Sequence, residues 1–475
     1  MKKNYLQKNL KDEKKIFYEI LKIYNKFENF KKKNEYNIVG VFFHELMHFF
    51  VSNICQKNSR VTFNNNNYYV AKFGKRGKKS IIKSKKNSLL IKILYKLYSI
   101  FFLKLKFKKK LLIGKSISLS LKNKIILVLF CLIHNYRLTL VNFDEVKIIL
   151  SKKLKLYFLE EVKKLLIKYK FDLKNLQDLK ILLKKITTNN DYLFNQPKKS
   201  IIISGSLGNI ENRLLAIKKN KINSKLLVLN HLPTFGLVSY RALKYDEFYL
   251  TDYYLTQRGK KISVNDNNYL GIDNKNYKII SLENKYQKYT SNYLKKINFN
   301  NLQEKKILYV PARVVRTSLI GDFIKSSDYE DWQYFLSKQF KKIDIKLPNK
   351  QFYYKKNNNF NNLNPKLKLL EICKKYDLII LDYISSSTFS EIASTNVPIL
   401  YFNLGRDHIR KDVKKLISSR IIEVKVDIFR SYKGFETMNN LKLYNYKKNK
   451  FVNLFSKIST QKSFYQNLVD IDERF

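Results

Sequence analysis

The chain has 475 residues, enough for two or three domains that each bury a hydrophobic core. Its 94 lysine and arginine residues outnumber 38 aspartate and glutamate residues, which gives a formal net charge of +56 at pH 7. This excess indicates either solvated surfaces rich in the residues of AT-rich codons or attraction to phosphates, nucleotides or acidic lipid headgroups. The lysines are spread along the chain without a zinc-finger, RNP-like or basic-zipper pattern, so we expect no specific nucleic-acid partner.

The cysteines and the start of the chain indicate a reducing compartment. Cys55, Cys131 and Cys373 are far apart and odd in number, which argues against a disulfide framework. The opening MKKNYLQKNLKDEKK has no apolar segment of the kind that a signal peptide requires. The longest apolar run, residues 125–133, is shorter than the roughly 20 residues that span a bilayer. We therefore expect a cytoplasmic protein.

Residues 1–195 have apolar residues that recur every three or four positions, as helices with one buried face require. The pattern is clear in IFYEILKIYNKF at 16–27 and YFLEEVKKLLIKY at 157–169. It predicts a mainly helical N-terminal region. Within that region, LLIKILYKLYSIFFLKLKF at 89–107 has lysines at roughly helical spacing. This segment is either a helix facing the core or an interfacial helix on an anionic membrane, which would make the protein peripheral to the inner face of that membrane.

The N-terminal region also contains His44-Glu45-x-x-His48, the spacing with which zinc peptidases hold a metal. Residues four apart share one face of a helix, so the two imidazoles could bind a single ion. A zinc site needs a third protein ligand. Val51 and Ile54 stand where the extended motif has Gly and His.

Other third ligands for this motif are scarce in the sequence. No aspartate or glutamate occurs from Leu46 to Phe143, and His134 is the remaining candidate. We expect His44 and His48 to pack on a buried helix and no metal to bind, with a zinc metallopeptidase as an alternative function.

From about residue 196 the pattern changes to alternating strands and helices, which is typical of a parallel α/β sheet. We expect an α/β protein with two Rossmann-like lobes, one over residues 196–300 and one over 301–430, followed by a C-terminal helical tail at 431–475. The strand-like runs are at 198–206, 224–231, 305–313, 377–383 and 398–403. Ligands of such sheets bind beyond the carboxyl ends of the strands, so we expect the site just after these runs.

The segment DYISSSTFSEIAST, which follows the strand at 377–383, combines a strand end with a hydroxyl-rich helix start. Hydroxyl side chains cap free N–H groups at a helix start, and the same N–H groups with the helix dipole can bind a phosphate. Asp382 ends the strand, and Glu391 lies one turn into the helix, where it could accept a hydrogen bond from a ribose or sugar hydroxyl. The hydroxyl residues are Ser385, Ser386, Ser387 and Thr388.

DYISSSTFSEIASTNVPILYF resembles the donor-binding segment of surface-polysaccharide transferases, which have the GT-B arrangement of two Rossmann-like lobes, and is also similar to that of CDP-glycerol glycerophosphotransferases. SGSLGNIENRLLAIKKNKINSKLLVLNHLPTFGLVSY at 204–240 resembles their strand, Arg-bearing helix and second strand. In the family that strand ends in Gln-His-Gly or similar. This chain has Asn230, His231 and Leu232 there, with Gly236 five residues past the histidine.

Together the resemblance and the strand ends imply a set of functional residues. His231 is the candidate general base, because an imidazole titrates near neutral pH, or else a structural histidine that holds a loop. His408, in GRDHIRKD at 405–412, is the second candidate for this role. Arg313 and Arg316 would stabilise charge on a leaving diphosphate, and Arg213, the hydroxyl turn and Glu391 would complete the donor site. Asn230, Gly236 and Asp382 are secondary candidates.

The predicted function is transfer of a sugar or glycerophosphate-like group from a nucleotide-activated donor to a surface-carbohydrate acceptor, which is free or lipid-linked. The reaction would need no cofactor, because arginines, lysines and helix dipoles can carry the charge. Besides the zinc metallopeptidase, a non-catalytic protein that binds polyanions or membranes is the other alternative.

Overall fold

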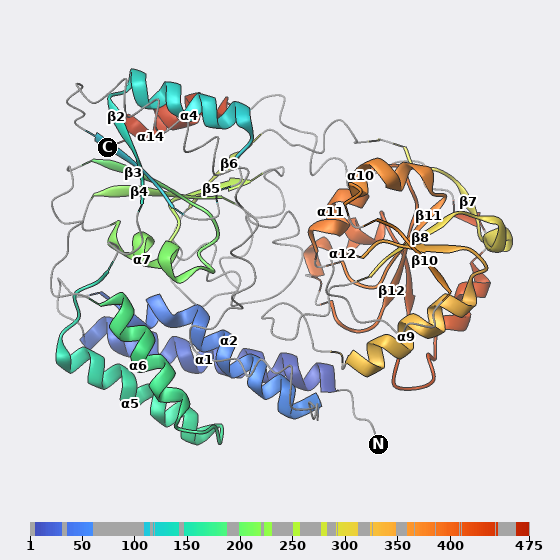
Figure 1. Ribbon diagram of the computed structural model, residues 1–475, viewed down its shortest axis with the longest axis horizontal. Coiled ribbons are helices and arrows are strands. Elements are labelled where there is room, and N and C mark those ends of the chain that lie inside the picture. The colour runs from blue at the N-terminus through green and yellow to red at the C-terminus, as the bar shows by residue number, and fades with distance from the viewer. Residues whose placement is uncertain are drawn as a thin grey trace. The chain divides into compact units, whose positions relative to one another are not determined.

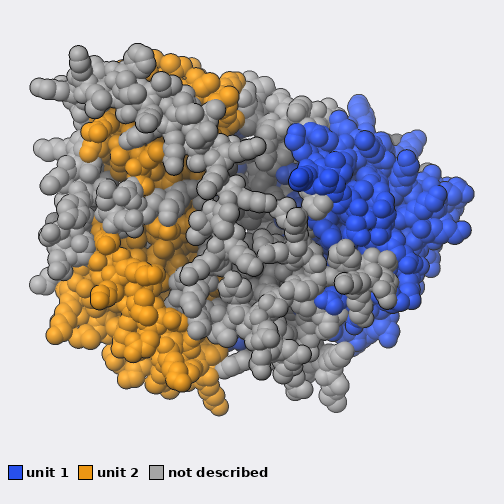
Figure 2. Space-filling model, viewed as in Figure 1, with its two compact units in different colours: residues 1–19, 50–69, 228–464 blue, residues 20–49, 70–227, 465–475 orange. Residues whose placement is uncertain are grey.

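The fold is described from a computed structural model of the protein (Figure 1). The described residues are 5–30, 36–59, 109–114, 117, 119–141, 147–187, 199–219, 223–229, 250–256, 277–282, 291, 293–311, 324, 326–347, 359–364, 366–384, 386–407, 409, 411–441, 443–444 and 462–474. The chain divides into two compact units, one of residues 1–19, 50–69 and 228–464 and the other of residues 20–49, 70–227 and 465–475 (Figure 2).

Six strands form the first sheet, in the order β2-β1-β3-β4-β5-β6. The registers of β1 with β2 and β3, and of β5 with β6, are parallel. Both β3 and β4 are almost continuous apolar runs, as strands covered on both faces require. The strands are β1 (Lys109–Ile113), β2 (Tyr136–Leu140), β3 (Ser200–Ser204), β4 (Ser224–Leu229), β5 (Tyr253–Thr256) and β6 (Lys278–Ser281).

The helices that connect the first sheet follow the usual crossover pattern of parallel strands. Helix α4 (Leu121–Ile133) joins β1 to β2, and α7 (Ile210–Lys218) joins β3 to β4. The C-terminal helix α14 (Phe464–Asp472) returns to this lobe and lies beside α4, where the Phe130 and Tyr465 rings are 6.1 Å apart (Figure 1).

Four further helices pack through aromatic side chains. They are α1 (Tyr5–Phe30), α2 (Ile38–Ser59), α5 (Lys152–Lys168) and α6 (Asn175–Ile186). Phe158 of α5 contacts Phe27 of α1 and Phe42 of α2, at centroid distances of 6.2 and 5.2 Å. Helix α2 is apolar on nearly all sides, and its described side chains are almost all buried, as such a helix requires.

The start of the first sheet differs from the sequence-based expectation. Strands β1 and β2 both lie within residues 1–195, which we expected to be mainly helical, so the sheet begins at Lys109 rather than near residue 196. The helices of that region are present. The two extra strands escaped notice because β1 opens with two lysines and β2 is a half-exposed edge strand.

The second sheet also has six strands, in the order β10-β9-β8-β11-β12-β13, and all its pairings are parallel. Its helices are α9 (Ser326–Gln339), α10 (Leu369–Ile372), α11 (Ser387–Ala393) and α12 (Lys411–Ser418). The strands are β8 (Ile307–Val310), β9 (Ile343–Ile345), β10 (Phe360–Asn362), β11 (Leu378–Leu381), β12 (Ile399–Asn403) and β13 (Ile422–Lys425).

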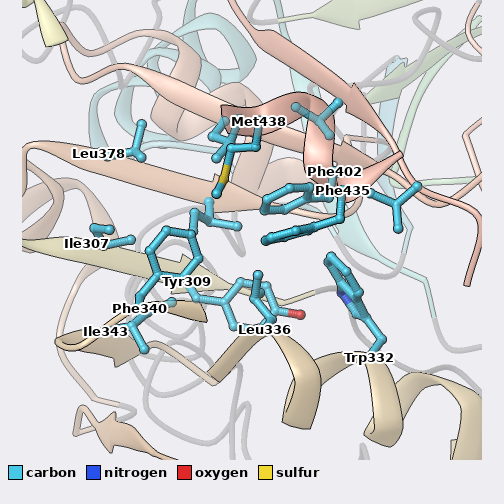
Figure 3. Close-up of a cluster of buried hydrophobic side chains, with 14 of the residues drawn as sticks. Ile307, Tyr309, Trp332, Leu336, Phe340, Ile343, Leu378, Phe402, Phe435 and Met438 are labelled. Carbon is cyan, nitrogen blue, oxygen red and sulfur yellow. The ribbon is translucent and has the colours of Figure 1, made fainter. Parts of the chain in front are cut away.

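Both faces of the second sheet carry a hydrophobic core. Successive residues of a strand point to opposite faces, so Leu400 and Phe402 of β12 face one cluster and Tyr401 faces the other. In the first cluster Trp332 of α9 packs against Phe402, with ring centroids 5.2 Å apart (Figure 3). The short 3₁₀ helices η6 (Phe299–Glu304) and η8 (Phe435–Asn440) close this face, while η7 (Cys373–Lys375) extends α10 and adds Cys373 to the other cluster. An antiparallel pair of β7 (Ile297–Asn298) and β14 (Leu443–Tyr444) completes the described elements.

The expected α/β class is confirmed: two parallel sheets with crossover helices form two Rossmann-like lobes, with helices at the N-terminal end. The predicted strands at 198–206, 224–231, 305–313, 377–383 and 398–403 contain β3, β4, β8, β11 and β12. Among the helices of the described residues, none has both the length and the apolar character needed to cross a bilayer.

Candidate functional site

The strand orders identify where each sheet is suited to bind a ligand. In open parallel sheets the ligand crevice lies beyond the carboxyl ends of the strands, at the point where the strand order reverses. In the second sheet this point lies between β8 and β11, because β9 and β10 extend to one side and β12 and β13 to the other. Arg313 and Arg316 follow β8 in the sequence and lie outside the described residues.

The end of β11 is organised around one buried carboxylate. Asp382 is fully buried, and its Oδ2 accepts hydrogen bonds from the Tyr309 hydroxyl at 2.5 Å, the Tyr329 hydroxyl at 2.7 Å and the Trp332 indole N–H at 3.3 Å. Burial, followed by the charge of Asp382, raises the pKa of both tyrosines well above the ordinary value, so both hydroxyls stay protonated and donate.

This arrangement corrects the expected role of Asp382. We expected Asp382, at the end of a strand, as a secondary candidate of the site, but its carboxylate faces α9 and holds that helix to β8 and β11. The aromatic partners are separated from Asp382 by at least 50 positions in the sequence, so no local motif revealed them.

Arg406 is the buried cation of this region, and the motif analysis did not single it out. The guanidinium carbon lies 5.4 Å from the centre of the Tyr329 ring and 5.1 Å from that of Tyr383, which are cation–π distances. Burial alone would lower its pKa, but the nearby Tyr329 and the charge of Asp382 raise it above the ordinary value. Arg406 therefore stays charged and balances Asp382.

The hydroxyl-rich turn forms a capped helix start, as expected. Ser386 is the N-cap of α11, and its Oγ accepts from the Phe389 N–H at 3.3 Å. Thr388 and Glu391 follow in the helix and are half-buried, so part of each side chain reaches the surface of the lobe. Ser385 and the side chain of Ser387 lie outside the described residues.

Asp407 holds this turn against the loop after β12. One of its oxygens, Oδ2, accepts from the Ile384 N–H and from the Tyr401 hydroxyl, both at 2.8 Å. The carboxyl ends of β11 and β12 are thereby joined. Asp407 belongs to the segment GRDHIRKD that we expected to close over a nucleotide, and His408 next to it lies outside the described residues.

Arg420 secures the opposite end of α11. Its buried guanidinium donates to the carbonyls of four residues, at distances of 2.7 to 3.2 Å. These carbonyls belong to Ile392, Ala393, Thr395 and Val397. A cation that caps the last carbonyls of a helix stabilises it, so α11 is fixed at both ends.

In the first sheet the strand order reverses between β1 and β3. Gly114 follows β1, and a Cβ placed there would lie 2.9 Å from Asn212 Oδ1 and 3.2 Å from Ser204 Oγ, so a larger residue would require these side chains to shift. The candidate base His231 follows β4, the next strand of this sheet, by two residues. Asn230, His231 and Gly236 lie outside the described residues.

Arg213 is the second residue whose expected role the structure corrects. Only 1% of it is exposed, and its guanidinium donates to the carbonyls of Val41 at 2.8 Å and Leu207 at 2.6 Å and to the carboxylate of Glu45. These three hydrogen bonds engage Nε and both terminal nitrogens of the guanidinium within the protein interior. Arg213 therefore joins α7 to α2 rather than presenting its charge to a donor diphosphate.

The same ion pair gives a structural role to the glutamate of the His-Glu-x-x-His motif. Glu45 binds Arg213, while the rings of His44 and His48 stack with their centroids 6.2 Å apart on the largely buried helix α2. His134, the remaining candidate third ligand, instead contacts Asp472 and Tyr465 of α14. Among the described residues, no group of three His, Cys, Asp or Glu side chains is placed to hold a metal ion.

Comparisons with known proteins give distant likenesses in structure. No family model and no curated protein matches the chain. UDP-GlcNAc 2-epimerase from Neisseria meningitidis aligns with 78% of this chain and 100% of its own, at 11% identity and a TM-score of 0.34. A structure described as trehalose-6-phosphate from E. coli, bound with UDP-2-fluoro glucose, aligns with 77% of this chain and 98% of its own, at 10% identity and a TM-score of 0.36.

The wall teichoic acid polymerase TagF aligns with 82% of this chain and 99% of its own, at 12% identity and a TM-score of 0.34. At these TM-scores, the assignment of two Rossmann-like lobes depends on the strand orders of this chain itself.

Proposed function

We propose that the protein is a transferase that moves a sugar or glycerophosphate-like group from a nucleotide-activated donor to a surface-carbohydrate acceptor. The observation that carries the proposal is the 3-2-1-4-5-6 strand order of the second sheet, whose reversal point is the carboxyl edge of β8 and β11. This is the edge at which sheets of this order bind nucleotides. The hydroxyl-rich turn and α11 follow β11 directly.

The donor would lie at this edge. Thr388 and Glu391, both half-buried, are the described side chains that we assign to donor contacts, together with Ser386. Arg313 and Arg316, which follow β8 in the sequence, would stabilise the charge that develops on the leaving diphosphate. Ser385 and Ser387 complete this proposed set.

The acceptor would bind to the first lobe, where His231 follows β4. The imidazole would remove the proton from an acceptor hydroxyl as its oxygen attacks the activated carbon or phosphorus, with His408 as the second candidate for this role. The role of both histidines is proposed from their positions in the sequence. Replacing each by alanine in turn identifies the base: loss of turnover in one variant, with donor affinity unchanged, assigns the role.

Donor binding is tested by thermal unfolding of the full chain with CDP-glycerol, UDP-glucose, UDP-GlcNAc and GDP-mannose. A ligand at 100 times its Kd stabilises the folded state by about 2.7 kcal/mol, which is readily measured. Because a chain of charge +56 can bind any polyanion, pyrophosphate at equal ionic strength is the control. Stabilisation by one donor beyond that of pyrophosphate supports the proposal, and equal or no stabilisation by all of them contradicts it.

Product analysis with the donor that binds then separates glycosyl transfer from glycerophosphate transfer. Replacing Glu391 by glutamine should weaken donor binding about tenfold while leaving pyrophosphate binding unchanged, because a carboxylate is proposed to accept from a donor hydroxyl. Replacing the exposed Glu371 of α10 by glutamine is the matched control in the same lobe.

A further inference from the structure

Helix α4 exposes a stripe of large aliphatic side chains. Leu121, Ile125, Leu129 and Ile133 recur at every fourth position, and they are 56%, 48%, 49% and 67% exposed. Residues four apart lie on one face of a helix, so the four side chains form a continuous row. Single exposed aliphatic residues are normal on soluble proteins, but an aligned row of four marks an interaction surface.

The opposite side of α4 is the side that packs on its own lobe. Asn123, Leu127, Phe130 and Cys131 are buried, and the Phe130 ring lies 5.3 Å from that of Tyr136 on β2. Two positions along an α-helix correspond to a rotation of about 200°, so Ile125 and Leu129 point away from the face that carries Asn123 and Leu127. The exposed row is therefore a second apolar face that the described part of the lobe does not use.

The charge on α4 itself is one-sided, although Asp472 of the neighbouring α14 contacts His134 at its C-terminal end. Lys122 and Lys124 lie on either side of the aliphatic row, and α4 has no acidic residue. From residue 46 to residue 143 the sequence has 21 lysine and arginine residues and no aspartate or glutamate. All 38 acidic residues of the chain lie in the other 377 positions. A codon bias that acts on the whole chain does not account for a local absence of acidic residues over 98 positions.

We propose that α4 docks this protein on the surface of a membrane that contains anionic lipids, with the aliphatic row in the acyl-chain boundary and the lysines at the headgroups. A helix with one apolar face and flanking lysines lies in the plane of the interface. With 13 residues, α4 is about 20 Å long and does not span the bilayer. Anionic headgroups attract each nearby lysine, which suits a helix that carries Lys122 and Lys124 and no acidic residue.

The charge also argues against a second copy of this chain as the partner of α4. Pairing two such faces would bring the Lys122 and Lys124 of one copy close to those of the other, and like charges repel. A bilayer with negative headgroups meets both the apolar and the basic parts of the surface. The proposal does not depend on the proposed transferase activity, and its test uses no substrate.

The test is sedimentation of the full chain with vesicles of phosphatidylcholine alone or of equimolar phosphatidylcholine and phosphatidylglycerol. We expect binding to the anionic vesicles that weakens with added salt. The double variant Ile125→Ser, Leu129→Ser should lower the partition coefficient at least tenfold, because each aliphatic side chain no longer enters the acyl boundary. Lys122→Glu should lower it several-fold.

The matched control is Leu156→Ser with Ile167→Ser on α5, where the side chains are 55% and 57% exposed and the chemical change is the same. This pair should leave vesicle binding unchanged. Far-UV circular dichroism and thermal unfolding check that both double variants fold like the parent chain. We expect that they do, because the substituted side chains are exposed.

Three results would overturn the proposal. The first is equal vesicle binding by the α4 variant and the parent chain. The second is equal loss of binding in the α5 control. The third is absence of vesicle binding together with a dimer, measured by light scattering, that the α4 variant converts to monomer, since this would make a second copy the partner.

Discussion

The carboxylate of Asp382 shows how a single buried residue can organise the end of a strand. Three donors from β8 and α9 converge on one oxygen, and the nearby Arg406 supplies the compensating charge. Removing one member of such a buried set leaves the others without their partners, which costs more than the net value of the contacts.

We predict that Asp382→Asn lowers the free energy of unfolding of the second lobe by about 3 kcal/mol, because Arg406 loses its counter-charge and one donor meets an amide N–H. Trp332 is the chain's single tryptophan and contacts Asp382, so its fluorescence during urea unfolding reports on this lobe. Tyr309→Phe removes one hydroxyl and should cost about 1 kcal/mol. Unchanged stability with loss of donor binding would instead return Asp382 to the role that the sequence suggested.

At the residue scale, the sequence predicted where strands end and helices start, but it did not predict which partners the side chains there would contact. It located the strand end at Asp382, the capped helix start at Ser386 and the packing of His44 and His48 on a largely buried helix. It did not reveal that Asp382 and Arg213 are turned inward, because their partners come from distant parts of the chain. Arg420 carries no local motif at all, since its role depends on carbonyls more than 20 positions earlier.

Among the elements, α2 and α7 are coupled through Glu45 and Arg213, which lie 168 positions apart. We predict that Glu45→Gln lowers the free energy of unfolding by about 3 kcal/mol, because it leaves a buried guanidinium without its counter-charge. Hydrogen exchange of α2 and α7 should rise together. The exposed pair of Glu160 and Lys163 on α5 provides the control, and Glu160→Gln should cost less than about 0.5 kcal/mol.

The same variant separates this structural role from the metallopeptidase alternative. In a zinc peptidase the Glu of the motif is the general base, so Glu45→Gln would abolish peptide hydrolysis while leaving stability and zinc content unchanged. A stable, zinc-loaded variant would contradict the assignment of Glu45 to Arg213.

Helix α14 is held to the first lobe by Asp472, which accepts from Lys109 Nζ at 2.6 Å and the Tyr136 hydroxyl at 2.7 Å. Burial alone would raise the pKa of Asp472, but these hydrogen bonds and the charges of Lys109 and His134 lower it below the ordinary value. A lowered carboxyl pKa contributes stability at pH values above the ordinary pKa of 3.8, and this stability is lost as the pH falls through the value in the folded protein.

We therefore predict that Asp472→Asn costs about 2 kcal/mol at neutral pH and that the cost shrinks below pH 3.8. The measurement is hydrogen exchange of β1, β2 and α14, or thermal unfolding, from neutral to acid pH. Asp470→Asn, on the same helix, controls for the loss of one negative charge. A difference that stays constant with pH would show that the carboxylate charge is not what holds the helix.

At the scale of elements, strands with continuous buried apolar runs were predictable, and edge or lysine-rich strands were not. Each predicted strand from residue 198 onward contains an observed one, because β-branched residues covered on both faces give a clear signal. In β2, an edge strand, Arg137 and Leu140 are exposed, so the strand lacks the continuous buried apolar run that made the other strands recognisable. The points at which the strand order of each sheet reverses could not be predicted from the sequence, because the strand order depends on pairing between distant segments.

At the scale of the whole molecule, the dominant property is a net charge of +56, which destabilises a compact state through self-repulsion. Several of the ion pairs among the described residues lie on exposed surfaces, where each contributes little. Salt weakens attractions and repulsions alike, so its net effect on stability depends on which of them prevails. For this chain the repulsion should prevail.

We predict that raising sodium chloride from low to moderate concentration at pH 7 increases the Tm by several degrees, because screening reduces repulsion among the lysines. Near the isoelectric point of about 9.9 the net charge approaches zero, so the same addition of salt should change the Tm much less. Differential scanning fluorimetry at both pH values, with sucrose as a non-ionic stabiliser for comparison, measures the effect. A Tm that falls with salt at pH 7 would mean that ion pairs outweigh the repulsion and that the excess of lysine costs the fold little.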